Sequence, residues 1–382
     1  MDVPWKECTW VSEREELVRQ ALAAKTSMSA LCRAFGISRK TGYKWLRRYQ
    51  AEGDQGLRDR SRRPQRSPAR SSLEMEAKVS ELRREQPTWG GRKIHHRLRL
   101  DGVEGVPAYS TITGILDRNG LLSSERRLHR DLQRFEAEQP NDLWQMDFKG
   151  HFQTGAGRCH PLTVLDDHSR FNLCLAACPN ERAETVREAL IGVFRCYGLP
   201  ERMLMDNGSP WGSDWEHRHT WLTAWLIHLG ITVGHGRPYH PQTQGKDERF
   251  HRTLKQDLLA RYTDWLDLCQ VQQAFDPYRH FYNHKRPHQA IGDLPPASRY
   301  KPSNRPFPDT LPAIEYETGD EVRKVQQQGR ISFRGRELLV SKAFTGEPVA
   351  LRAREDGVWN VYYCHQQVGR LDLRTPPPSC LV

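Results

Sequence analysis

The order of strand-like and helix-like runs in residues 141–255 restricts the possible folds more than any other feature of the chain. Short apolar runs at 144–149, 161–166 and 171–176 are typical of strands, and the last alternates large apolar with small or polar side chains. Because only short links separate these three runs, they favour an antiparallel meander, in which each strand pairs with the one before it.

Beyond the third run the pattern changes to an alternation of helices and strands. Apolar residues at helical spacing predict a helix over 184–197, and a strand follows at 202–205. The same pair recurs as a helix from about 215 and a strand at 231–233, before a final helix that carries residue 248. Three strands followed by this alternation predict a mixed sheet with helices on both faces.

The final helix carries a carboxylate among cations, in the stretch RPYHPQTQGKDERFHRTLK at residues 237–255. Two prolines and a glycine precede Lys246, so the helix can begin only near that residue. Helical spacing predicts an apolar face made of Phe250, Leu254 and Leu258. It places Glu248 with Arg252 and Lys255 on another face, which could point at a polyanion.

Two aspartates upstream of Glu248 also lie where strand-like runs end, Asp147 in DLWQMDFKG and Asp206 in RMLMDNGSP. Carboxylate oxygens are the ligands that Mg²⁺ prefers, and strand ends at one edge of a sheet bring distant residues together. Taken singly, Asp147 could be a capping residue and Asp206 part of a turn. The pair Asp166 and Asp167 is a rival, but its place between two strand-like runs predicts a hydrogen-bonded turn.

Five stretches between residues 141 and 300 carry a resemblance to a known family. They are WQMDFKG, LDDHSRF, MDNGSPW, HPQTQGKDERFHRTLK and YNHKRPHQAIGDLPPASRY. In this order they resemble the DDE transposases of bacterial insertion sequences, whose catalytic domain is similar to that of retroviral integrases. The resemblance implies an RNase H-like fold, and it implies that Asp147, Asp206 and Glu248 are the catalytic and metal-binding residues.

The same resemblance implies two Mg²⁺ ions per active site, with Mn²⁺ able to substitute, and a reaction in two steps. Water frees a 3′ end of the element, and this 3′-OH then attacks target DNA. The expected protein is a transposase or integrase that binds double-stranded DNA and forms a dimer or higher oligomer on it. The alternatives are a DNA-binding regulator of transposition with an inactive core, and a structure-specific nuclease without strand transfer.

Two features depart from the family pattern. The interval from Asp206 to Glu248 is 42 positions (248 − 206), longer than is usual in the family. Asp247 adds a second carboxylate, which on a helix points about 100° away from Glu248. We expect it at the surface and expect Asp247→Asn to change catalysis little.

His240 and Gln244 are expected to position the DNA end or to pack the loop. The cations predicted to hold phosphates are Lys246, Arg249, Arg252 and Lys255.

The first 55 residues have the pattern of a helix-turn-helix unit. Helices are predicted from residue 13, from Ser29 and after a cap at Ser38, with a tight turn at Gly36 and Ile37. The third helix begins with side chains that could contact the major groove. They are Arg39, Lys40, Thr41, Tyr43, Lys44 and Arg47. A three-helix scaffold or dimerisation module is the alternative.

Residues 56–70 contain six arginines and almost no large apolar side chain, so they cannot form a core. They are either a plain linker or an arm on DNA, with Arg62, Arg63 and Arg66 as its contacts. Residues 71–125 are again helical in pattern and resemble a second helix-turn-helix unit, with a last helix capped by Ser110. Its polar face is either a DNA contact or a solvated surface, and it consists of Arg92, Lys93, His95, His96 and Arg97.

After a proline-rich linker, short β-like runs at close spacing predict a small closed or half-closed barrel. It resembles the SH3-like barrel of related transposases.

The predicted fold class is multidomain, with N-terminal α-helical helix-turn-helix modules, a central α/β RNase H-like (integrase) core and a C-terminal all-β SH3-like barrel. The predicted segments are 1–55, 56–70, 71–125, 126–140 (a linker), 141–302, 303–320 and 321–375.

Charge and cysteine content support a DNA-binding protein with reduced thiols. The formal net charge of +11 suits a phosphate-bearing partner. Nine scattered cysteines without a C-x-x-C pair argue against disulfides and against a zinc domain. The sequence has neither a run of eighteen apolar residues nor a secretory leader. We therefore expect a cytoplasmic, nucleoid-associated bacterial protein that does not bind membranes.

Overall fold

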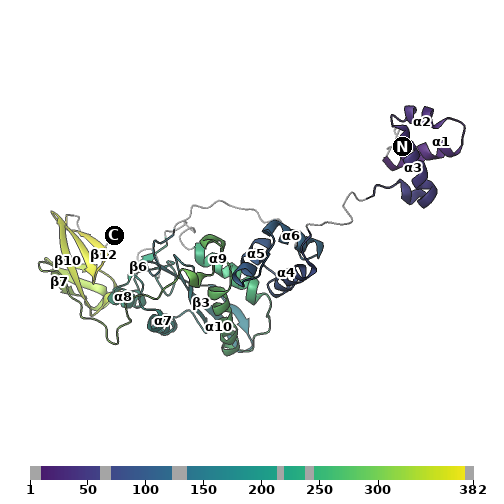
Figure 1. Cartoon of the computed structure of the whole chain (residues 1–382). Coiled ribbons are helices and arrows are strands. Elements are labelled where there is room, and N and C mark those ends of the chain that lie inside the picture. Colours follow the sequence, from purple (N-terminus) through teal and green to yellow (C-terminus); the bar gives the residue numbers. More distant parts are fainter. Residues whose placement is uncertain (1–9, 61–69, 123–135, 213–218, 237–244, 375–382) are drawn as a thin grey trace. The chain divides into compact units, whose positions relative to one another are not determined.

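The computed structural model describes residues 10–60, 70–122, 136–212, 219–236 and 245–374. The chain divides into two compact units, Met1–Arg70 and Ser71–Val382, which we describe separately (Figure 1). Within the described ranges, no helix is long and apolar enough to cross a bilayer.

The first unit is built from three helices. They are α1 (Trp10–Leu22), α2 (Met28–Ala34) and α3 (Arg39–Glu52), followed by a 3₁₀ turn at Gly53–Leu57. Ser38 caps α3, as predicted, because its side chain accepts a hydrogen bond from Thr41 N. α2 begins at Met28, one residue before the predicted Ser29, and its cap is Ser27. The buried core of the unit consists of Leu17, Val18, Leu31, Trp45 and Leu57.

The central sheet of the second unit has six strands. They are β1 (Trp144–Phe148), β2 (Phe152–Thr154), β3 (Gly157–Asp166), β4 (Asn172–Cys178), β5 (Arg202–Met205) and β6 (Thr232–His235). β3 pairs antiparallel with β1, β2 and β4, whereas β5 runs parallel to both β1 and β6. The predicted meander and mixed sheet are confirmed, and β2 is a strand that was not predicted.

Helices cover both faces of this sheet (Figure 1). Val164 of β3 belongs to a core shared with α7 (Ala183–Tyr197) and α8 (Trp221–His228). The next residue, Leu165, belongs to a core shared with α9 (Gly245–Leu254) and α10 (Leu268–His284). Because successive side chains of a strand point to opposite faces, the two helix pairs lie on opposite sides. This is the arrangement expected of an RNase H-like core, although α10 was not predicted.

Three helices precede the sheet in the chain, and the segment that joins the first two packs against α10. They are α4 (Leu73–Glu85), α5 (Gly91–Leu100) and α6 (Tyr109–Arg118). Buried Trp89 stacks on Phe281 of α10, with 5.8 Å between ring centroids. Ala108 is the cap residue of α6, so the predicted cap, Ser110, lies inside the first turn. These helices therefore form part of the larger unit.

The polar face of α5 is directed largely at this core. Arg92 and His96 both contact the buried carboxylate of Asp293, at 2.7 and 3.3 Å. Arg97 donates to the carbonyl oxygen of Lys285 at 3.2 Å. A buried carboxylate is costly without a cationic or hydrogen-bonding partner, so these contacts join α5 to the core. This face was predicted to be either a DNA contact or a solvated surface, and neither alternative included a contact with the core.

The C-terminal part is all-β, as predicted. A four-stranded antiparallel sheet has the order β12 (Gln366–Asp372), β11 (Val358–Tyr363), β10 (Pro348–Glu355) and β7 (Glu321–Lys324). A hairpin of β8 (Arg330–Phe333) and β9 (Arg336–Leu339) packs on it, with Phe333 against Trp359 at 5.0 Å between centroids. Since the described strands pair as two separate sheets, the closed SH3-like barrel stays a prediction.

The start of segment 303–320, predicted as a linker, is docked on the core. Leu199 N donates to the Arg305 carbonyl oxygen at 2.8 Å. The Arg305 guanidinium donates to the carbonyl oxygens of Pro200 and Gly230, at 2.7 and 2.8 Å. The proline-rich composition suggested a free linker. The docking could not be predicted, because hydrogen bonds to distant carbonyl groups leave no pattern in the local sequence.

The C-terminal sheet is attached to the edge strand β6. The side-chain amide of Gln366 accepts a hydrogen bond from Val233 N at 2.8 Å and donates to Val233 O at 3.0 Å. An amide has the same donor and acceptor as a peptide group. Gln366 therefore pairs with β6 much as a further strand would.

Candidate active site

Asp147 and Asp206 lie side by side at the carboxyl ends of two parallel strands. Trp144 of β1 pairs with Met203 of β5, and each aspartate is three positions further along its strand (147 − 144 and 206 − 203). Adjacent parallel strands end at the same edge of a sheet. The fold therefore brings these two residues to one edge, as predicted.

The two aspartates and Glu248 are close enough for their charges to interact. Burial, and then the charge of Asp206, raise the pKa of Asp147 to about 7, and the charges of Glu181 and Glu248 act in the same direction. Burial also raises the pKa of Asp206, although Gly208 N donates to Asp206 Oδ1 at 3.0 Å. Crowded carboxylates of this kind favour a cation between them.

Strand β6 holds the backbone at Asp206. His235 Nδ1 lies 2.9 Å from the Asp206 carbonyl oxygen, and Gly236 N donates to the Met205 carbonyl oxygen. Asn207 Nδ2 donates to the Gly236 carbonyl oxygen at 2.8 Å. The Asp-Asn-Gly sequence thus forms a turn, and that turn also presents a carboxylate.

Glu248 lies in the first turn of α9, and its side chain is exposed. Phe250 and Leu254 are buried, as the helical spacing predicted. Within the described residues, no three histidine, cysteine or carboxylate side chains are close enough together to hold a metal ion. The charge of Glu248 therefore acts on Asp147, but its carboxylate is not gathered with the two aspartates. Exposed cations on the same helix and its continuation are Arg249, Arg252 and Lys255.

The prediction that Asp247 lies at the surface is wrong. Its side chain is 0% exposed. Thr163 Oγ1 lies 3.5 Å from Asp247 Oδ1, and Oδ2 has no hydrogen-bond partner among the described residues. Burial, and then the charge of Asp147, raise the pKa of Asp247 well above its ordinary value. The 100° that separates it from exposed Glu248 turns Asp247 toward β3 and not toward solvent.

Lys246 is also turned toward the protein. Its ammonium group forms an ion pair with the buried carboxylate of Asp167, which accepts further hydrogen bonds from Gln145 Nε2 and Ala137 N. Lys246 was predicted to contact phosphates of DNA. In the structure its charge instead neutralises the buried carboxylate of Asp167. Asp166 accepts a hydrogen bond from Ser169 N within the turn and another from the distant Asn141 N. Asp166 therefore has the role that was predicted for the pair, whereas Asp167 pairs with Lys246.

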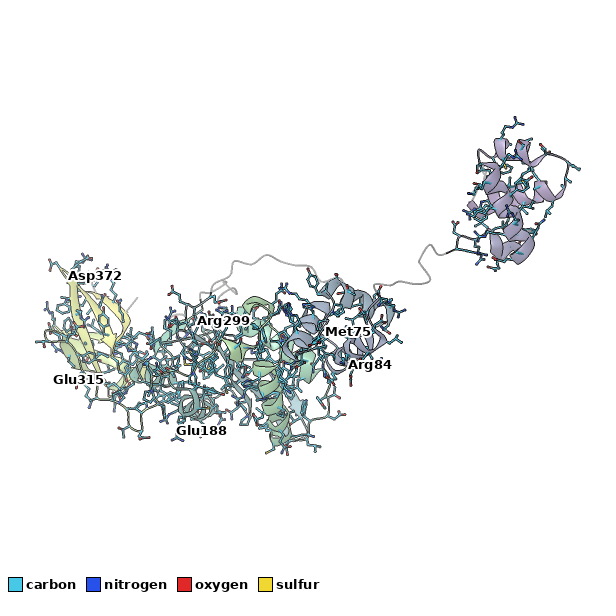
Figure 2. All side chains as sticks on the ribbon, viewed as in Figure 1. Met75, Arg84, Glu188, Arg299, Glu315 and Asp372 are labelled. Atoms are coloured by element: carbon cyan, nitrogen blue, oxygen red, sulfur yellow. The ribbon has the colours of Figure 1, made fainter. Side chains whose placement is uncertain are left out.

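Arg299 braces this turn from a distant part of the sequence. Its guanidinium donates to Glu136 Oε1 at 3.0 Å and to His168 Nε2 at 2.9 Å. Figure 2 labels Arg299 among the side chains of this unit. Arg299 belongs to the stretch YNHKRPHQAIGDLPPASRY. One function of that stretch is therefore to support the segment that holds Lys246.

Glu181 was not among the predicted site residues, yet its charge acts on both aspartates. His160 Nδ1 lies 2.8 Å from Glu181 Oε1. β4 and β1 are both antiparallel to β3, so they end at the same edge of the sheet. A carboxylate shortly after the end of β4 was the sequence signal that could have identified it.

In the first unit, the residues predicted to contact DNA lie along α3. The Thr41 hydroxyl is hydrogen-bonded to Ser38 Oγ at 2.9 Å, and the Lys44 ammonium lies over the Trp45 ring, 4.6 Å from its centroid. The exposed members are Arg39, Lys40, Tyr43, Lys44 and Arg47. Outside the described residues lie Arg62, Arg63, Arg66, His240 and Gln244.

The acidic residues suit a hard divalent cation. Asp147, Asp206 and Glu248 offer only oxygen atoms, which Mg²⁺ and Mn²⁺ accept as ligands. Their mutual repulsion, which contributes to the raised pKa of Asp147, is relieved when a cation binds. The chemistry of these side chains therefore fits the predicted metal.

Models of known protein families match most parts of this chain. The family model described as IS481 family transposase, C-terminal domain, matches residues 320–378, and two integrase core domain models match 137–241 and 229–296. Together these matches support a DDE transposase of a bacterial insertion sequence with an integrase-like core. A helix-turn-helix domain matches the transposase at 13–65 and a homeodomain-like domain at 41–116. These domains indicate DNA binding and a core of the polynucleotidyl-transferase type, and integrase cores generally use a divalent metal ion.

Proteins of other mobile elements are similar to this transposase. An uncharacterized 39.2 kDa protein of insertion element IS476 from Xanthomonas euvesicatoria is 28% identical over 240 residues, covering 60% of this chain and 65% of that protein, just under two thirds of its length. An uncharacterized 31.7 kDa protein of IS407 from Burkholderia multivorans is 26% identical, covering 63% and 84%. The transposase for transposon Tn552 of Staphylococcus aureus is 24% identical, covering 80% and 69%.

Among solved structures, the catalytic core domain of BIV integrase is 26% identical to the transposase. The match covers 41% of this chain and 92% of that chain, with a TM-score of 0.32. The family assignment does not rest on this likeness.

Proposed function

We propose that the transposase frees the 3′ ends of its element by phosphodiester hydrolysis and joins them to target DNA by transesterification. Asp147, Asp206 and Glu248 are the proposed catalytic and metal-binding residues, with two Mg²⁺ ions in the site and Mn²⁺ able to substitute. The observation that carries this proposal is that Asp147 on β1 and Asp206 just after β5 lie at equal positions along two paired parallel strands, with Glu248 near enough to act on the pKa of Asp147.

Each group of side chains has one task in this proposal. The three carboxylates supply oxygen ligands, and bound divalent ions supply the Lewis acidity that in-line displacement at phosphorus requires. The attacking groups are water and then the 3′-OH, so no side chain forms a covalent bond to DNA. The exposed cations beside Glu248 hold phosphates of the DNA end, namely Arg249, Arg252 and Lys255.

End recognition is assigned to the first unit. Its helix α3 enters the major groove, with Arg39, Lys40 and Arg47 as exposed donors along one helix. The arginine-rich segment that follows the buried Leu57, up to residue 70, tracks the DNA as an arm. Because an element has two ends that must reach one target, the proposed active form is a dimer or higher oligomer on DNA.

A DNA-binding regulator of transposition with an inactive core is the second candidate. One observation favours it, namely that no three possible ligands within the described residues are close enough to hold a metal ion. In this candidate the first unit keeps its function, and the acidic residues have none. The two candidates differ in whether DNA is cleaved and joined.

The test is to incubate the full chain with labelled element ends, target DNA and Mg²⁺, and to separate cleaved from joined products. The proposal expects both products from the wild type and neither from Asp206→Asn, with end binding unchanged in a gel-shift assay. Binding without either product contradicts the proposal and favours the regulator. Cleavage without joining favours the nuclease.

A further inference from the structure

Thr163 connects the strand that carries Asp147 to the helix that carries Glu248. Thr163 is fully buried on β3, directly opposite Asp147 in the antiparallel pairing with β1. Its hydroxyl lies 3.0 Å from the Asp147 carbonyl oxygen and 2.8 Å from His251 Nε2 on α9. A single hydroxyl group therefore contacts both elements.

The proton of this hydroxyl group determines the direction of the hydrogen bonds. Thr163 has one proton to donate, and the Asp147 carbonyl oxygen at 3.0 Å can only accept. When the proton goes to this carbonyl oxygen, His251 Nε2 donates to Thr163 Oγ1; Asp247 Oδ1, at 3.5 Å from the hydroxyl, is the more distant acceptor. His251 Nδ1 lies on the other side of the ring, 3.9 Å from Asp147 Oδ2. The imidazole thus lies between Thr163 and the carboxylate of Asp147.

His251 also sets the position of Glu248. The two residues are three positions apart on α9, so their side chains are neighbours on the helix surface. A hydrogen bond from His251 to the sheet fixes both the rotation of α9 about its axis and its height above β1. Because the carboxylates of Asp147 and Glu248 do not touch, this contact between helix and sheet sets the distance between them.

We propose that Thr163 and His251 are positioning residues, which hold the Asp147 carboxylate and the Glu248 helix in the geometry that metal binding requires. The inference rests on the proposed function, since it assumes that both carboxylates are ligands. In this role neither Thr163 nor His251 is itself a metal ligand. Residues that orient metal ligands typically change metal affinity or activity by about 10-fold to 100-fold when they are replaced.

Two substitutions at one position separate this role from simple packing. Thr163→Val keeps the shape of the side chain and removes the hydroxyl, whereas Thr163→Ser keeps the hydroxyl and removes a methyl group. Positioning predicts that valine is the harmful change and serine the tolerated one. Packing alone predicts the reverse. The matched control is Thr253→Val, at a buried threonine of α9 itself.

The measurement is the affinity of the full chain for Mn²⁺, determined by calorimetry without DNA, together with the Mg²⁺ concentration for half-maximal cleavage. We expect Thr163→Val and His251→Leu to weaken both by about 10-fold or more, with end binding near that of the wild type. Thr163→Ser and Thr253→Val should resemble the wild type. If Thr163→Val binds Mn²⁺ as tightly as the wild type, the proposal is overturned.

The calorimetric comparison does not depend on catalysis, so the two proposals can fail separately. A wild-type protein that binds Mn²⁺ but yields neither cleaved nor joined DNA contradicts the proposed function alone. In that case weaker Mn²⁺ binding by Thr163→Val still supports the positioning role. A wild-type protein that binds no Mn²⁺ overturns the positioning proposal as well.

Discussion

At the scale of single residues, two adjacent carboxyl groups of α9 lie in opposite environments. Asp247 is fully buried, whereas Glu248 is exposed. Burial raises the pKa of Asp247 well above its ordinary value, so it disfavours the charged form, and asparagine keeps the shape of the side chain without that charge. We expect Asp247→Asn to keep the rate of DNA joining in a product assay. A loss of more than about tenfold would show that the ionised carboxylate is needed.

Asp147 should make the stability of the metal-free protein depend on pH. Its pKa is raised to about 7 in the folded chain, against about 3.9 in an unfolded one. Between these values the folded state binds the additional proton, so its contribution to stability is present at low pH and is lost as pH rises through about 7.

Asp147→Asn cannot ionise, and it should therefore remove this part of the pH dependence. In EDTA, the melting temperature of the variant should exceed that of the wild type by an amount that grows between about pH 4 and pH 8. Thermal unfolding at several pH values measures this difference. A constant difference across the range contradicts the prediction.

At the scale of elements, Gln366 joins the C-terminal sheet to the core. Gln366→Leu leaves the N–H and C=O groups of Val233 without their side-chain partner. An unsatisfied buried polar group costs about 1–3 kcal/mol, so the free energy of unfolding should fall by roughly this amount in a denaturant titration. Gln367→Leu, at the exposed neighbouring position, is the control and should change it little.

The arginine-rich segment should contribute to DNA affinity through its charge. In the full chain, replacing Arg62, Arg63 and Arg66 by alanine should make the plot of log binding constant against log salt less steep. The slope changes by about 0.9 for each phosphate contact that is lost, and fluorescence anisotropy with element ends measures it. If the slope does not change, the segment is a passive linker.

At the scale of the whole molecule, local patterns predicted the elements but not the contacts between distant ones. The strand at 202–205 has its predicted bounds, because a short apolar run between turns has few alternatives. The contact between Arg92 and Asp293 spans 201 positions, and the charges of a helix do not reveal their partner. The same is true of Gln366 and Val233, which are 133 positions apart.

In the candidate site, too, local patterns predicted some features and not others. Asp147 and Asp206 were predictable because each follows an apolar run that forms a strand, and Glu248 because it lies opposite an apolar helix face. The directions of Asp247 and Lys246 were not predictable. Helical periodicity gives the angle between two side chains, but it does not show which of them faces the sheet.

The central claim is that Glu248 completes a catalytic site with Asp147 and Asp206, and DNA joining by Glu248→Gln beside Asp247→Asn tests it most directly. Glutamine keeps the packing of α9 and removes an anionic ligand, so the loss should fall on the chemical step. We predict that Glu248→Gln binds element ends like the wild type but yields neither cleaved nor joined DNA, while Asp247→Asn yields both. Joined product from Glu248→Gln at the wild-type rate would contradict the account.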